Sequence, residues 1–441
     1  MSTFWYWFAI AVGAAVLVIL SYLIFPATAS LEDWDDYGPT PVLTDPKSPL
    51  LPTVRPSRAI GWADGEKPSA ANGLEVAAFA QGLTHPRWLY ALPNGDILVA
   101  ESDAPATSRT CNSVMNLFAR LVMKYGGSRT VSADRISLLR DTNGDGVADE
   151  THIFIDALHS PYGMALIGDD LYVANADTVV RFPYVSGQSQ ITASPVLVAN
   201  LPAGRNHHWT KNIIPAPGGE SLFVTVGSNS NVGECGPADE VQRAAIHQLT
   251  LANGDLQEFA TGLRNPNGMA IEPQTGTLWT VVNERDEVGG DLVPDYITSV
   301  RQDDFFGWPY SYFGENAQPD LDDRWPADDR VARPPDYAVG SHTASLDIAF
   351  TYNSTLPTTW RSGLVITQHG SWNRSPRSGY RVLYLPFQNG MPTGDPIVMV
   401  DGFLNEQNKA RGRPVGVAID NRGAVLIADD VGNTVWRVTS Q

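Results

Sequence analysis

A nine-residue segment, 141–149, has the residue types and spacing of a calcium-binding loop. Oxygen-bearing side chains stand at its first, third, fifth and ninth positions, a glycine at its sixth, and a backbone carbonyl could serve at its seventh. Ca²⁺ prefers oxygen ligands in such an arrangement. His152 instead of glutamate at the twelfth position argues against an EF-hand. The pattern predicts a structural Ca²⁺ site, and the alternative is a plain turn. Its ligands would be Asp141, Asn143, Asp145, Val147 and Asp149.

Histidine and arginine side chains recur in five further segments: 206–212, 264–268, 283–291, 369–377 and 411–414. If these loops share one end of a fold, a general base, several guanidinium groups and carboxylate or carbonyl oxygens face one pocket. The chain has 48 acidic and 30 basic residues, a net charge of −18. Guanidinium groups gathered in so acidic a chain predict a bound anion, with carboxylates suited to bidentate arginine contacts.

The elements that must position these loops form a repeat. Apolar segments with β-branched and aromatic residues recur at 96–100, 170–174, 221–226, 277–282, 362–367 and 424–429, each between turn residues. Each is preceded by another apolar segment, and most are followed by a third candidate strand. Six units of about 60 residues suit four-stranded blades. We therefore predict an all-β six-bladed propeller with a ligand at the loop end of its channel; the alternative is a β-sandwich pair or a barrel. Residues 112–125 have helical spacing and predict a short inserted helix.

Composition excludes several other classes of protein. An acidic chain lacks the basic face that a non-specific nucleic-acid binder needs, so no nucleic-acid partner is expected. No strand-linked Gly-x-Gly-x-x-Gly motif argues for NAD, and no Cys-x-x-Cys-His motif argues for haem. The two cysteines, Cys111 and Cys235, could form one disulfide in an oxidising compartment.

Residues 4–25 carry no charge and, at about 1.5 Å per residue, are long enough to cross the ~30 Å hydrocarbon layer of a membrane. We expect an uncleaved transmembrane helix within 1–29, with aromatic residues at its interfaces. The alternative is a signal peptide cleaved before Ser30, since small residues precede it. The proline-rich residues 30–73 are expected to form a tether, and the propeller domain to span 74–441.

Six longer motifs occur in the propeller part of the chain: His-Trp-Thr-Lys-Asn at 208–212, Thr-Gly-Leu-Arg-Asn-Pro-Asn-Gly at 261–268, Val-Asn-Glu-Arg-Asp at 282–286, Phe-Gly-Trp-Pro-Tyr at 306–310, His-Gly-Ser-Trp-Asn-Arg at 369–374 and Gly-Arg-Pro-Val-Gly-Val at 412–417. Through these motifs, residues 74–441 resemble the glucose/sorbosone dehydrogenase family, most closely its L-sorbosone dehydrogenase branch. The resemblance implies a six-bladed propeller that uses pyrroloquinoline quinone and calcium.

The resemblance also implies roles for single residues. His208 would be the catalytic base, with His207 as the alternative, and Arg264 with Asn265 would contact the quinone oxygens. Arg411 and Arg413 match the paired arginines that bind cofactor carboxylates. Arg374 would take the place of a lysine that the family has in blade five, and Arg377 is the second choice. The cofactor's calcium would be held by backbone carbonyls of Glu284 and Arg285, where the family usually has Gly-Pro, with Asp291 near the ion.

The implied reaction oxidises a sugar. His208 would remove a proton from the anomeric hydroxyl or hydrated aldehyde while a hydride passes to the quinone, and Ca²⁺ and Arg264 would stabilise the developing negative charge. A separate electron acceptor, a membrane quinone or a cytochrome, would then be needed. We expect a single-pass inner-membrane protein with a periplasmic catalytic domain. The alternatives are a Ca²⁺-dependent lactonase-type hydrolase and a non-catalytic binding propeller.

Overall fold

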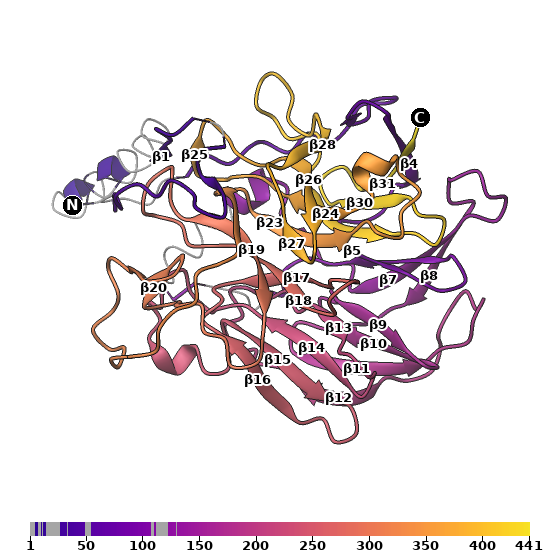
Figure 1. The fold of residues 1–441 in the computed structure, drawn as a ribbon, viewed down its shortest axis with the longest axis horizontal. Coiled ribbons are helices and arrows are strands. Elements are labelled where there is room, and N and C mark those ends of the chain that lie inside the picture. Colours follow the sequence, from indigo (N-terminus) through magenta and orange to yellow (C-terminus); the bar gives the residue numbers. More distant parts are fainter. Residues whose placement is uncertain are drawn as a thin grey trace.

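The protein is described by a computed structural model that covers residues 5–7, 10, 12–14, 27–32, 34–48, 54–106, 110–111, 122–128 and 130–441. Its main body consists of six antiparallel sheets, the blades of a propeller (Figure 1). Blade I contains β5 (Pro86–Ala91), β6 (Ile97–Glu101), β7 (Arg135–Arg140) and β8 (Glu150–Ile155). Blade II contains β9 (Met164–Ile167), β10 (Asp170–Ala174), β11 (Thr178–Pro183) and β12 (Val196–Asn200). Blade III contains β13 (Ile213–Pro215), β14 (Ser221–Val226), β15 (Ala245–Thr250) and β16 (Leu256–Thr261).

The remaining blades each recruit a strand from the N-terminal part of the chain. Blade IV contains β17 (Pro266–Ile271), β18 (Leu278–Val282), β19 (Pro294–Val300), β22 (Tyr337–Ser341) and β2 (Tyr37–Gly38). Blade V contains β23 (Ser345–Phe350), β24 (Gly363–Gln368), β26 (Arg381–Gln388), β28 (Ile397–Asp401) and β3 (Ser69–Ala70). Blade VI contains β29 (Pro414–Ile419), β30 (Val425–Asp429), β31 (Thr434–Ser440) and β4 (Leu74–Gln81). The predicted six-bladed propeller is confirmed.

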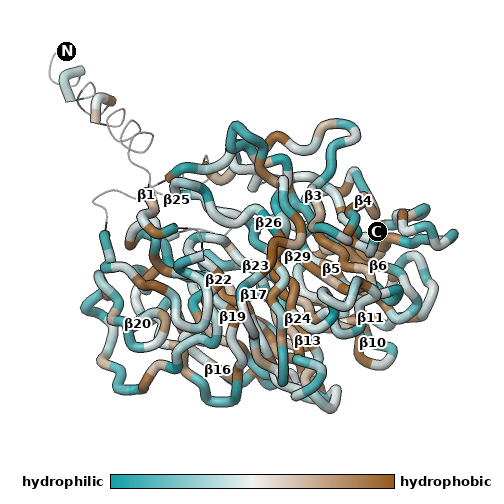
Figure 2. Tube along the Cα trace, turned by 45° about the horizontal axis from the view of Figure 1, so that its top comes forward, coloured by the Kyte–Doolittle hydropathy of each residue, from teal (hydrophilic) through white to brown (hydrophobic). Residues whose placement is uncertain are grey.

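The second strand of each blade explains why the repeat was visible in the sequence. Every residue of β6, β14, β18, β24 and β30 is buried. Blades pack face to face, so both faces of these strands are covered, and the sequence shows continuous apolar runs without alternation. Figure 2 shows hydrophobic stretches within the body and hydrophilic ones in many of the outer loops.

The first strands of the six blades, β5, β9, β13, β17, β23 and β29, contact one another in that order around a ring. The ring is closed by β4, which pairs along its whole length with β31 and so joins the start of the domain to its end. This pairing was not predicted, because a lone strand before the first repeat carries no sign of its distant partner. Because neighbouring strands in each blade are antiparallel, the loops that precede first strands and the loops that follow second strands lie at the same end, and the predicted histidines and arginines are in those loops.

The segment predicted as a tether is attached to the propeller at several points, which a free tether would not be. Strand β1 (Ala27–Thr28) pairs in parallel with β25 (Arg374–Ser375), β2 extends blade IV, and β3 extends blade V. Exposed strand edges offer unpaired backbone groups, so a proline-rich segment can bind them without an apolar pattern of its own. In the described residues no helix is long and apolar enough to cross a membrane.

Two further sequence predictions concern segments near the N-terminus and the first blade. Most of the predicted transmembrane segment, including residues 15–26, lies outside the described residues, as does most of the predicted helix at 112–125, of which residues 122–125 are described and helical. Cys111 and Cys235 form a disulfide with their Cα atoms 5.6 Å apart, so the bridge left open by the sequence is formed. It ties a loop of blade I to the loop after β14 in blade III.

Candidate active site

His208 lies in the loop between β12 and β13, and its ring is oriented by blade III. Its Nδ1 lies 2.8 Å from the Ser228 carbonyl oxygen and 3.0 Å from the Ser228 hydroxyl. A backbone carbonyl can only accept, so Nδ1 carries the proton and Nε2 keeps its lone pair. This tautomer is the one in which Nε2 can act as a general base.

The protonation state of His208 is set by its surroundings. Burial lowers the pKa of the imidazole well below 6.5, and the neighbouring Arg264 guanidinium lowers it further. The imidazole is therefore neutral at neutral pH and able to accept a proton. His208 and Arg264, predicted as a catalytic pair, are brought together by the fold.

Arg264 and Asn265 lie in the loop between β16 and β17, next to His208. The Arg264 guanidinium donates to the Asn231 carbonyl at 3.0 Å, to the Asn283 carbonyl at 3.1 Å and to the Asn231 side chain at 2.9 Å. Three of its five N–H groups are thus used and two are free for a ligand. Gly227 allows the close approach, because a Cβ there would collide with Asn265 Oδ1 and His208 Cβ.

The Asn265 side chain fits a ligand contact. Its Oδ1 is buried and has no hydrogen-bond partner within the described residues. Buried polar side chains are nearly always paired, so an orphaned amide oxygen beside a candidate base indicates a group that the polypeptide does not supply. Because Oδ1 can only accept, it fits an N–H or O–H group of a ligand, whereas a contact with a quinone oxygen has to come from Arg264 N–H groups or the Asn265 Nδ2.

The loop predicted to hold the cofactor's calcium, 284–285, lies beside Arg264. Within the described chain, neither the Glu284 carbonyl nor the Arg285 carbonyl accepts a hydrogen bond, which leaves both oxygens available as cation ligands. The Arg285 side chain is directed elsewhere, donating to the Asp286 and Pro319 carbonyls. Burial raises the pKa of the Glu284 carboxyl to about 7, against the effect of Arg264. The donor set fits carbonyl ligation.

Sequence reasoning missed a polar group next to this loop. The Asp286 carboxylate accepts hydrogen bonds from His342 Nδ1 at 2.9 Å and from Asn373 Nδ2 at 2.9 Å. Burial disfavours both ionised forms, but Asp286 raises the pKa of His342, and His342 lowers that of Asp286. The pair links blade IV to blade V beside Arg264. Asp286 stands in the acidic run 283–291, which was a visible signal; nothing in the sequence marked His342 as its partner.

Asp291 binds the N-terminal segment. Its carboxylate accepts from the Ser30 amide at 2.7 Å, the Ser30 hydroxyl at 2.6 Å and the Leu31 amide at 3.3 Å. Gly290 permits this docking, because a Cβ there would meet the Thr28 and Ala29 backbone. Both oxygens of Asp291 are used in this way, so its contacts do not support the predicted position near a metal ion.

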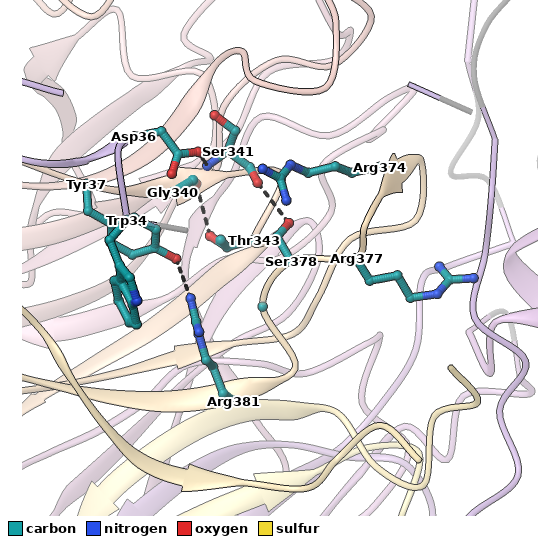
Figure 3. Close-up of a pocket in the computed structure, with 11 residues that line it drawn as sticks. Trp34, Asp36, Tyr37, Gly340, Ser341, Thr343, Arg374, Arg377, Ser378 and Arg381 are labelled. Atoms are coloured by element: carbon teal, nitrogen blue, oxygen red, sulfur yellow. Dashed lines mark hydrogen bonds between the residues drawn. The ribbon is translucent and has the colours of Figure 1, made fainter. Parts of the chain in front are cut away.

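Arg374 lies in a small pocket of about 100 Å³ between the N-terminal segment and blade V (Figure 3). Its guanidinium lies near Ser341 and Ser378, and it donates to the Gly290 carbonyl at 2.7 Å. Arg377 points away from the pocket centre and donates to the Pro56 carbonyl. The structure therefore ties both predicted substitutes for the family's lysine to loop and N-terminal backbone. His208, Arg264 and Arg413 are not among the residues that line the pocket.

The predicted arginine pair at 411 and 413 is split. Arg413 is buried, lies 3.4 Å from His369 Nδ1 and stacks over the Tyr380 ring at 4.9 Å. Arg411 forms an ion pair with Glu66 at 3.1 Å and lies over the Trp62 ring at 5.9 Å. Both partners of Arg411 belong to the N-terminal segment, whereas Arg413 contacts His369 and Tyr380 of blade V.

The predicted calcium loop joins β7 to β8 at the outside of blade I. Asp141 accepts from the Gly144 and Gly146 amides and pairs with Arg422 at 2.7 Å, while Asp149 accepts from Thr142 and Asn143. Across the described residues, no three His, Cys, Asp or Glu side chains are grouped to hold a metal ion. The loop is thus held by its own amides, far along the chain from the candidate base, and Ca²⁺ binding there stays a prediction.

Comparison with known proteins places the chain in a family of propellers. It belongs to the TrAA12-like family, whose model matches residues 129–304 and 301–441. The resemblance to quinone-dependent sugar dehydrogenases is thereby confirmed, but the sorbosone branch is not distinguished.

Individual relatives agree with this assignment. The chain is 27% identical over 293 residues to an uncharacterized protein of Borreliella burgdorferi, covering 64% of this chain and 76% of that one. It is 22% identical over 365 residues to the pyrroloquinoline quinone-dependent pyranose dehydrogenase of Coprinopsis cinerea, covering 73% of this chain but only 45% of the relative. The holo structure of that enzyme's PQQ domain superposes with a TM-score of 0.64 at 18% identity, covering 87% of this chain and 100% of the domain.

Proposed function

We propose that the protein is a quinoprotein sugar dehydrogenase that oxidises an aldose or a sorbosone-like aldehyde at C1, with pyrroloquinoline quinone and Ca²⁺. One observation carries the proposal: within the described residues, a neutral imidazole with an open Nε2, the Arg264 guanidinium and the unpaired Asn265 amide oxygen lie next to one another. The fungal pyranose dehydrogenase, named for the same cofactor, supports it.

The chain's own residues supply the acid–base part of the reaction. His208 Nε2 accepts the proton of the C1 hydroxyl, or of the hydrated aldehyde, as the C1–H bond breaks. When bound, the quinone supplies the two-electron acceptor for the hydride. Arg264 and Asn265 hold the acceptor in place, and the fixed guanidinium favours negative charge developing near it. The sugar loses one proton and one hydride, which balances the oxidation to a lactone or acid.

We assign the cofactor's Ca²⁺ to the free carbonyls of Glu284 and Arg285. A cation there lies beside Arg264, where the acceptor's charge develops. A second, structural Ca²⁺ at Asp141–Asp149 is part of the proposal; it must compete with Arg422 for the Asp141 carboxylate. Asp291 is left out of the ligand set, since it holds Ser30.

The cellular setting is also proposed. The uncharged residues 4–25 anchor the chain in the inner membrane, with the propeller in the periplasm, an oxidising compartment that suits the Cys111–Cys235 disulfide. Electrons leave for a separate acceptor, a membrane quinone or a cytochrome.

Reconstitution tests the proposal directly. Full-length apoprotein is mixed with pyrroloquinoline quinone and Ca²⁺, and reduction of a redox dye is followed with a panel of aldoses and sorbosone. We expect turnover that requires both additions and at least one sugar. Lactone hydrolysis without the quinone would instead identify a hydrolase, and absence of both cofactor binding and turnover would identify a binding propeller.

A further inference from the structure

A second buried arginine faces Arg413 from the opposite side of the same side-chain cluster. Arg87 is the second residue of β5, the inner strand of blade I, and is 9% exposed. Its guanidinium pairs with Asp430 at 2.5 Å. It also lies 6.0 Å from the Tyr162 ring centroid and 5.9 Å from that of Trp209, the residue after His208. Arg87 thus connects the loop of the candidate base to blade VI.

Arg87 and Arg413 flank one neutral histidine. His369 Nε2 donates to Asp430 at 2.9 Å, and its Nδ1 lies 3.4 Å from Arg413. Nδ1 therefore accepts from Arg413, which requires an unprotonated ring. Burial and both guanidinium groups lower the pKa of His369 to about 4, against the effect of Asp430. Each arginine therefore uses its Nη1 within the cluster: Arg87 with Asp430, and Arg413 with His369.

The inner atoms of this cluster lack partners. Arg87 Nε, Arg413 Nε and Asp430 Oδ1 are buried and unpaired within the described residues. A buried guanidinium nitrogen without an acceptor is costly, and neither Nε is bonded to the unpaired Asp430 Oδ1, so the two indicate an acceptor that the described residues do not supply, while Asp430 Oδ1 calls for a donor. Of the nearby carboxylates, Asp430 is shared by Arg87 and His369 and lies 3.6 Å from His85, and Asp103 accepts from the Ala104 and Thr130 amides and lies 3.8 Å from His85. The two guanidinium groups can therefore take another anion.

We infer that Arg87, not Arg411, is the partner of Arg413 in binding a carboxylate of the quinone cofactor. The inference rests on the proposed function. Arg411 is committed to Glu66 and Trp62 of the N-terminal segment, whereas Arg87 sits in the cluster that holds Arg413 and touches the loop of His208. Arginine at this position pairs with a planar carboxylate through parallel N–H groups.

Equilibrium dialysis of the quinone against full-length apoprotein with Ca²⁺ tests this without any turnover. R413M and R87M should each weaken cofactor binding at least tenfold, and R411M should stay within twofold of the wild type. R181M, which breaks the half-exposed Arg181–Asp170 pair on blade II, is the matched control for loss of one positive charge and should bind as the wild type does. Weakening by R411M that equals or exceeds that by R87M would restore the pair 411/413 and overturn the exchange, as would R87M binding within twofold.

Removing Arg87 alone leaves Asp430 with one cation fewer and could unfold the blade. The double variant R87M/D430N removes both charges and is compared with D430N, which keeps both arginines. At equal thermal midpoints, the double variant should bind the quinone at least tenfold more weakly than D430N, and equal binding would overturn the inference. A wild-type protein that binds no quinone at all would mark failure of the proposed function instead, so the two failures are distinguishable.

Discussion

The two sides of the channel's loop face differ in what holds their polar side chains. On blades III and IV, His208, Arg264 and Asn265 are fixed by loops of the same two blades, and each keeps an atom free toward the shared space. By contrast, the N-terminal segment takes up Asp291 of a blade IV loop and Arg374, Arg377 and Arg411 of blades V and VI, through backbone pairing, hydrogen bonds and an ion pair. Of the predicted residues on blades V and VI, Arg413 alone contacts other blade residues, His369 and Tyr380, instead of the N-terminal segment.

The difference shows that a segment outside the propeller, here the N-terminal one, can change which partners the arginines and aspartates of the propeller bind. Guanidinium and carboxylate groups bind whichever partner the fold brings within reach, so an arginine of the right spacing can serve an ion pair instead of a ligand. The blade III–IV side should therefore respond to substitutions in activity, and the blade V–VI side mainly in stability. Each prediction below tests that division.

The largest effect is expected from His208→Ala. Loss of the general base should lower turnover by about 10²- to 10⁴-fold while quinone affinity changes less than about twofold. Turnover and cofactor dialysis on the same preparation separate the two. His207→Ala is the control and should keep most of the activity; the reverse outcome would show that the base is assigned one residue too far along the chain.

A stability effect on the blade III side comes from Glu240, in the loop after β14. Burial raises the pKa of its carboxyl to about 7, whereas in the unfolded chain it is near the ordinary 4.5. The folded state therefore keeps the proton between these values, so this stabilising contribution is present below pH 4.5 and is lost as the pH rises to 7. Glu240→Gln removes the titrating carboxyl. Between pH 4.5 and 8 the free energy of unfolding of the variant should therefore rise relative to that of the wild type by roughly 3 kcal/mol.

Unfolding free energies of both proteins across this pH range check the prediction. Glu240→Gln should leave turnover little changed, because Glu240 acts behind the site, accepting from the Asn229 amide at 2.8 Å. A difference between variant and wild type that does not vary with pH would show that Glu240 is ionised throughout.

These tests also bear on how far sequence reasoning reached. The second strands were located nearly to the residue because burial on both faces leaves an uninterrupted apolar run between turns, as in Ser221–Val226. The segments that hold His208, Arg264 and Asn265 were singled out by their equivalent places in a repeat, and the family resemblance gave each residue its role, which stays a prediction. Such patterns depend only on residues that are neighbours in the chain, so they can be recognised without knowing the distant contacts.

What the sequence could not show were pairings between distant segments. Strand β4 closes the propeller through backbone bonds to β31, and β1 and β2 use the same kind of bond, which any residue type can make. The diversion of Arg411 to Glu66 and the gathering of Arg87 with Arg413 are consequences of those pairings and of the closed ring. Arg87 stood at the head of the first repeat, yet its charge gave no hint of Asp430, 343 residues away.

At the blade IV loop where the N-terminal segment docks, Asp291→Ala should release that segment. Three donors lose their charged acceptor, which we expect to cost about 2–3 kcal/mol, less than the sum of the three because water replaces part of it. Limited proteolysis should then cut within 27–48, and the thermal midpoint should fall. If the segment stays protected while Ca²⁺ affinity collapses, Asp291 belongs with the metal after all.

The smallest effect is expected from Ser30→Ala. The variant loses the hydroxyl bond to Asp291 at 2.6 Å but keeps the amide bond at 2.7 Å, so about 0.5–1.5 kcal/mol should be lost. In the Asp291→Ala background the same substitution should cost nothing, because the hydroxyl no longer has its acceptor. A double-mutant cycle on unfolding free energies measures this coupling. Additive effects of the two substitutions would mean that the Ser30 hydroxyl is not held by Asp291, whose carboxylate would then be open to another ligand.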